Sequence, residues 1–303
     1  MTNSTNLPGA ALKTSWNETV FGFEFLSTFL LIFFTYSWML IAILAKKNKS
    51  KIFIAFGYTA ATALAFFLPW AVASVASKKP VYPMLNLLIV LFQSFIRGFG
   101  EWGQSNRLEP IGKPLVNGLP YILGAQFLGG MTGFMLFVAF FYAVKFIFKN
   151  NDEYKELQNL TLFALFKKDY EFGLLSYTIK EFIFITLFLC TIPFIGMIDT
   201  TNYQLNGFQI VLIQIFVIGI ILFFSLFFNF FAIHLFFNFV ELLVKTIEFI
   251  KLPKNDKNAY KKNYLIIWAK FTIVLIISIL MPIVVALISI LIKIKSGAVI
   301  AVS

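Results

Sequence analysis

The sequence predicts an all-α integral membrane protein with six transmembrane helices and two re-entrant half-helices, arranged as two inverted repeats. Hydrophobic residues make up 59% of the 303 residues and charged residues only 13%, whereas soluble domains carry about 25% charged residues. The apolar residues form long segments, and two of these segments open with a similar Glu-Phe pattern. We therefore expect one membrane domain, residues 1–303, in a multi-pass protein of the cell membrane.

Eight apolar segments follow one another at about 20–45, 52–76, 81–99, 119–148, 173–197, 208–228, 229–250 and 264–292. A transmembrane helix needs roughly 20 apolar residues, and six segments provide them. The segment 81–99 is short, and 229–250 carries Asn, His and Glu without a polar turn before it. Because non-helical backbone at membrane depth is tolerated only inside protein or a cavity, these two segments indicate half-helices near a central site.

A repeated pattern divides the chain into two halves. EFLSTFLLIFF begins at Glu24 and EFIFITLFLCT begins at Glu181, about half the chain later. The first half covers 20–148 and the second 173–292, with a charged, partly helical connector at 149–172. Three spans in each half mean that the second half is inverted relative to the first.

Several motifs resemble the aquaporin and aquaglyceroporin family (the major intrinsic proteins), which includes the glycerol uptake facilitators. The two Glu-Phe segments resemble its first and fourth spans, and YILGAQFLGGMTG at 121–133 resembles its third. Shorter matches in the same order are Ala55-Phe56-Gly57, Val217-Ile218-Gly219 and Pro282-Ile283-Val284. The resemblance implies facilitated diffusion of a small neutral solute such as water or glycerol, no cofactor, no enzymatic chemistry, and a homotetramer in the lipid bilayer.

The family's Asn-Pro-Ala signature, which opens each half-helix, is degenerate in both halves. Asn86 takes the position of the first Asn, with Leu87 and Leu88 in place of Pro and Ala. In the second half Asn238 is the preferred candidate, and Asn229 is the alternative. The resemblance implies that both Asn side chains donate hydrogen bonds to the passing solute, where helix N-termini create a positive field that disfavours cations.

The resemblance also assigns two further sets of residues. Glu24 and Glu181 would be buried carboxylates that accept hydrogen bonds from the half-helix backbone, and the alternative is that each lies at the headgroup interface. A constriction would be formed by Phe66 (or Ala65), Phe227, Leu235 and Glu241. Glu241 stands where the family has an arginine, so ordinary water-channel selectivity does not follow.

Other candidate sites are weak. His234, the single histidine, either lines the pore or packs among aromatic side chains, and Cys190 is expected to be a buried thiol. The sequence shows no metal-ligand cluster, phosphate loop or catalytic set. The net charge of +11 indicates lipid headgroups rather than nucleic acid, because the lysines lie in short loops between the spans.

The loops do not agree with the family orientation. Most of the 25 lysines and arginines lie after spans one, three and five, within 46–51, 145–180 and 245–270. The positive-inside rule places such loops in the cytoplasm, whereas the family has both termini there.

Two alternatives to a channel stay open. One is a non-conducting scaffold whose pore is plugged by phenylalanines, and the other is a small secondary transporter that uses a membrane glutamate.

Overall fold

The computed structural model describes residues 16–76, 83–102, 119–151, 154–166, 173–195, 205–228 and 234–296, and this part of the chain is helical without a β-strand. Six helices are long and apolar enough to cross a membrane. They belong to α2 (Glu18–Leu44), α3 (Lys51–Ala76), α6 (Leu119–Ile147), α9 with α10 (Leu174–Leu189 and Ile192–Ile195), α12 (Gly207–Phe227) and α14 (Lys254–Ser296).

Many large apolar side chains on these helices are exposed, among them Val75, Phe146 and Leu175. A monomeric soluble protein rarely exposes contiguous apolar surface on this scale. Such a surface suits the hydrocarbon core of a bilayer, so the chain is a multi-pass membrane protein.

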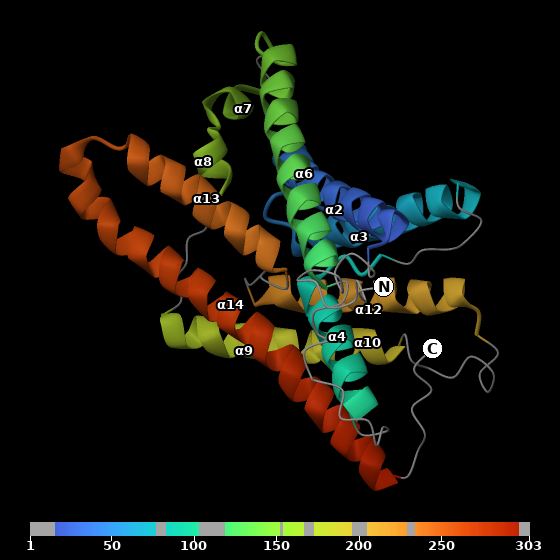
Figure 1. Ribbon diagram of the computed structural model, residues 1–303. Helices are drawn as coiled ribbons and strands as arrows, with labels where there is room; N and C mark the ends of the chain where they lie inside the picture. The colour runs from blue at the N-terminus through green and yellow to red at the C-terminus, as the bar shows by residue number, and fades with distance from the viewer. Residues whose placement is uncertain are drawn as a thin grey trace, which may run out of the picture.

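Two shorter helices complete the order span, span, short helix, span, which occurs twice. They are α4 (Leu87–Trp102) and α13 (Leu235–Lys251). At 1.5 Å per residue they are about 24–26 Å long, shorter than the roughly 30 Å hydrocarbon core. In Figure 1 both begin near the middle of the molecule and run away from each other.

The observed helices follow the predicted segments closely, with a clear departure at the start of the last span. The basic stretch 252–263, which lies outside the apolar segments of the sequence, is helical from Lys254 onward and continues without a break into that span. Pro253 precedes the helix and its carbonyl accepts from Asp256 and Lys257, and no glycine or proline interrupts the next turns. A hydropathy pattern detects the apolar part of such a helix but not its polar extension.

Close packing of α2 on α6 depends on glycine. A Cβ on Gly129 would overlap the carbonyl oxygen of Phe25, and one on Gly133 would overlap the carbonyl oxygen of Phe29. Both pairs are four residues apart, so they fall on one stripe of each helix. Small residues at this spacing let two backbones approach closely in a membrane.

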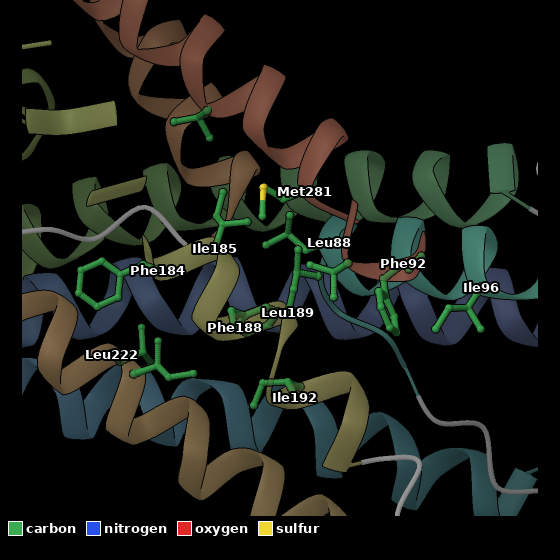
Figure 2. Packing of buried hydrophobic residues seen from close by; sticks show 14 of the residues in the cluster. Leu88, Phe92, Ile96, Phe184, Ile185, Phe188, Leu189, Ile192, Leu222 and Met281 are labelled. Atoms are coloured by element: carbon green, nitrogen blue, oxygen red, sulfur yellow. The ribbon is translucent and has the colours of Figure 1, made fainter. Parts of the chain in front are cut away.

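Each short helix is buried among spans of the other half. Leu88, Phe92 and Ile96 of α4 belong to a core cluster otherwise made largely by α9, α12 and α14, and Figure 2 shows this packing. Phe236 and Val240 of α13 belong to a second cluster built mainly by α2 and α6. The two halves of the chain therefore interlock through α4 and α13.

The connector between the halves is partly helical, as predicted, with α7 (Lys155–Asn159) and α8 (Leu162–Leu165). Lys145 Nζ, in the last turn of α6, donates to the carbonyls of Gln158 and Leu160, and Gln158 Nε2 donates back to the carbonyl of Lys145. These bonds tie the connector to the end of α6.

Candidate functional site

The candidate site is the junction where α4 and α13 begin, and Glu24 of α2 organises one side of it. Glu24 is buried. Its Oε2 accepts from the backbone N–H of Met84 at 2.8 Å, and its Oε1 accepts from the N–H of Leu85 at 2.8 Å and from Gln126 Nε2 at 2.7 Å. A buried carboxylate is costly unless such donors satisfy it, and here three donors from two segments do so.

The segment before α4 has an unusual backbone. Leu85 has a φ of 60°, in the left-handed region that costs a non-glycine residue roughly 1–2 kcal/mol. The next residue, Asn86, caps α4, because its Oδ1 accepts from the N–H of Leu88 at 2.9 Å. The hydrogen bonds that Met84 and Leu85 donate to Glu24 offset the conformational cost at Leu85 and fix the direction in which α4 starts.

His234 caps α13 and joins it to the start of α4. Its Nδ1 accepts from the N–H of Phe236 at 3.2 Å, which leaves Nε2 to donate to the carbonyl of Leu85 at 2.8 Å. The ring is buried and meets Phe237 edge-on, with centroids 5.5 Å apart. The N-termini of the two short helices are therefore in direct contact.

This junction concentrates positive electrostatic potential. The first N–H groups of a helix lack intrahelical partners, and its dipole carries about half a positive charge at that end. Two such ends meet here beside Asn86, whose carboxamide carries both donor and acceptor groups. The carboxylate of Glu24 lies against the segment that leads into α4, so it offsets part of this potential.

The second predicted signature residue lies elsewhere. Asn238 is in the second turn of α13, and the capping position equivalent to that of Asn86 is occupied by His234. Asn238 Nδ2 donates to the carbonyl of His234 at 3.4 Å, and its Oδ1 accepts from Tyr177 Oη at 3.4 Å. The alternative, Asn229, lies outside the described residues.

Glu181 of α9 is fully buried within the protein, and its depth in the bilayer stays a prediction. Its predicted role is to accept hydrogen bonds from the backbone that precedes α13. That segment, 229–233, lies outside the described residues, and the role stays a prediction.

The structure does not bring the four predicted constriction residues together. Phe66 is buried with Leu85 and Val211, near the start of α12, whereas Phe227 ends that helix, about 24 Å further along it. Phe227 is 59% exposed, and Lys51 Nζ donates to its carbonyl. Leu235 packs against the cluster around α4 and α9, and Glu241 is buried one turn beyond Asn238.

Glu241 and Asn238 line a small cavity together with Tyr177, Ile267, Lys270 and Phe271. Its volume is about 10 Å³, room for roughly one water molecule. Lys270 of α14 is buried, with Nζ 5.2 Å from the centre of the Tyr177 ring. A carboxylate and an ammonium group thus share one cavity in the membrane-spanning part of the molecule.

No site role was predicted for Gln126 or Lys270, and the capping role of His234 was not predicted. Histidine is not a preferred N-cap, so no capping rule finds it. Gln126 stood within the quoted third-span motif without a role. Lys270 could have been found as a lone charge inside the apolar segment 264–292, since an intramembrane ionisable group is a functional candidate.

Within the described ranges no group of three or more His, Cys, Asp and Glu side chains could hold a metal ion. Comparison of the chain with protein-family models, with curated proteins and with solved structures finds no match. The function is therefore argued from the geometry of the junction.

Proposed function

We propose that the chain is a divergent aquaporin-like channel for the facilitated diffusion of water and small neutral solutes such as glycerol. The observation that carries this proposal is the contact between His234 Nε2 and the carbonyl of Leu85. It joins the N-termini of two helices that are both too short to span the membrane. In the proposal α4 and α13 are re-entrant half-helices that meet at the bilayer centre.

The packing supports two inverted repeats. If α2, α3, α4 and α6 correspond to α9, α12, α13 and α14, the contacts of α2 with α3 and α6 correspond to those of α9 with α12 and α14. The contact of α4 with α14 likewise corresponds to that of α13 with α6. The contact between α3 and α12 would lie on the symmetry axis, where a Cβ added to Gly219 would come within 2.9 Å of Thr59 Oγ1.

One observation favours a non-conducting scaffold as a second candidate. Leu87 and Leu88, which replace the signature Pro and Ala in the first half, are large, and Leu88 is buried beside the junction, as is Phe236 of α13. Phe236 also lies against Gly130, whose Cβ would come within 2.6 Å of the ring. A secondary transporter is the third candidate, and Glu241, which lines one small cavity together with Lys270, is a carboxylate that it could use.

The test is stopped-flow light scattering on proteoliposomes under water and glycerol gradients. We expect permeability well above that of empty liposomes. Asn86→Leu should reduce it about tenfold, because a hydrogen bond of about 1–1.5 kcal/mol to the solute is lost. Asn206→Leu is the matched control, since Asn206 caps α12 in an exposed position and accepts from the N–H of Gln209.

Two results would decide against the proposal. Wild-type permeability at the level of empty liposomes for both solutes would remove the channel and support the scaffold. Saturable, pH-dependent uptake would support the transporter. Size-exclusion chromatography of each variant separates loss of transport from loss of folding, because both substitutions remove one helix cap.

A further inference from the structure

The short helix α13 carries a row of polar side chains, here called the polar stripe: Asn238, Glu241, Lys245 and Glu248. Steps of three and four residues place these side chains along one face of the helix. A neighbouring face carries Phe236, Phe237, Val240 and Val244, which are buried in the cluster built with α2 and α6. The helix is thus amphipathic although it lies inside a membrane protein.

Three of the four residues of the polar stripe are buried, and Glu248 at its end is partly exposed. The exposed fractions are 8% for Asn238, 4% for Glu241 and 8% for Lys245. Ionisable side chains inside a membrane protein are costly and almost always face the bundle interior or a water-filled cavity. The small cavity bordered by Asn238, Glu241 and Lys270 shows that the stripe borders space as well as protein.

Polar contacts continue along α13 in both directions from this cavity. At the inner end, the N-terminus of α13, Asn238 Nδ2 donates to the carbonyl of His234, and the ring of His234 bonds to the carbonyl of Leu85 at the junction. At the outer end, toward the C-terminus of α13, Lys245 Nζ lies 2.8 Å from Glu248 Oε2, which also accepts from Tyr260 Oη at 2.8 Å. The row of polar groups therefore connects the junction of the short helices with the outer end of α13.

We propose that the polar stripe and Lys270 form the wall of a hydrated passage, which leads solute from the outer end of α13 to the junction. This inference deepens the proposed function and rests on it. The wall contains two glutamates and two lysines, so acidic and basic side chains are equal in number and offer no single-sign attraction to an ion. Its hydrogen-bonding groups suit water and small uncharged hydroxylated molecules.

The chain offers a direct test, because Cys190 is its single cysteine. The prediction that this thiol is buried is wrong, since Cys190 is exposed at the end of α9. In a Cys190→Ser background, one cysteine at a time is introduced at Asn238, at Glu241, at Val240 or at Lys251. Proteoliposomes are exposed to Ag⁺ on both faces, and the thiols that remain free are counted by alkylation after unfolding. Ag⁺ is small, reacts with thiols and does not cross an apolar bilayer.

Val240→Cys and Lys251→Cys are the controls. Val240 is fully buried on the apolar face of α13, and Lys251 is exposed at the end of the same helix. We expect Asn238→Cys and Glu241→Cys to react at rates close to that of Lys251→Cys. Val240→Cys should react about 100-fold more slowly, the factor that corresponds to the cost of placing an ion in an apolar span.

If Asn238→Cys and Glu241→Cys are both as slow as Val240→Cys, the stripe is a dry contact between α13 and α14 and the inference is wrong. This result is distinct from failure of the channel proposal. If the proteoliposomes are permeable and the stripe does not react, the channel proposal stands and this route is wrong. If the proteoliposomes are impermeable and the stripe reacts, the stripe lines a hydrated cavity and not a solute passage.

Discussion

Replacing Glu24 by Gln is expected to lower the free energy of unfolding by about 3–5 kcal/mol and to abolish solute permeation. Both oxygens of the carboxylate accept hydrogen bonds. An amide presents one oxygen and one NH₂ group, so at least one backbone N–H would face another donor. Each hydrogen bond to a charged group contributes about 1.5–3 kcal/mol. The loss of two of them accounts for the expected change.

The same substitution should release Leu85 from its left-handed conformation, so α4 would no longer start in a fixed direction. Unfolding is measured by titration with sodium dodecyl sulfate from a mild detergent, followed by circular dichroism, and permeation by stopped-flow light scattering. Glu18→Gln is the matched control, because Glu18 lies in the first turn of the same helix and is exposed. Equal unfolding midpoints for the two variants would contradict the role assigned to Glu24.

The second large effect concerns the contact between α2 and α6. Gly129→Ala and Gly133→Ala should each destabilise the protein by about 1–3 kcal/mol, the usual cost of overpacking. The added Cβ would overlap a backbone carbonyl, of Phe25 or of Phe29, and a backbone group cannot turn aside as a flexible side chain can. The two helices would have to separate, which would also move Glu24 away from Gln126. The same detergent titration measures the change.

Gly124 provides the control for this pair within the same helix. A Cβ at Gly124 would meet no atom within 4 Å. Because alanine is favoured over glycine in a helix by about 1 kcal/mol, Gly124→Ala should leave stability unchanged or raise it. Destabilisation of Gly124→Ala as large as that of Gly129→Ala would show that the packing stripe is not the cause.

Hydropathy and length predicted the spanning helices because a bilayer selects long apolar segments. The helix predicted at 119–148 is observed at Leu119–Ile147, and the one at 208–228 is observed at Gly207–Phe227. The polar first turns of α14 were not predicted, because solvated helical turns carry no hydropathy signal. The break after Leu189 was also missed, although Pro193 gives a signal for it: a proline has no N–H to bond the carbonyl four residues earlier, which is that of Leu189.

The site could be predicted only where a residue type had a strong physical reason to be there. A glutamate inside an apolar span needs donors, which drew attention to Glu24, and Asn86 is a residue type that caps helices. His234 has no such signal, because histidine is not a preferred N-cap, and its bond to the carbonyl of Leu85 forms only when the fold brings the two segments together. The constriction was inferred by spacing along the chain, and spacing does not reveal that Phe66 and Phe227 lie toward opposite ends of α12.

The bonds of Glu24 also bear on how the chain is made. Its backbone donors, Met84 and Leu85, follow it by 60 and 61 residues, and Gln126 follows by 102. At a synthesis rate of about 5–20 residues per second, the last partner emerges roughly 5–20 s after Glu24. If the first span enters the membrane as it is made, it does so before its carboxylate has any of these partners, and its mean hydropathy of 2.0 favours the insertion. If a ribosome stalled before residue 84, the first helix would be anchored while Glu24 still lacked its three hydrogen-bond donors. A membrane chaperone would meet the helix in this form.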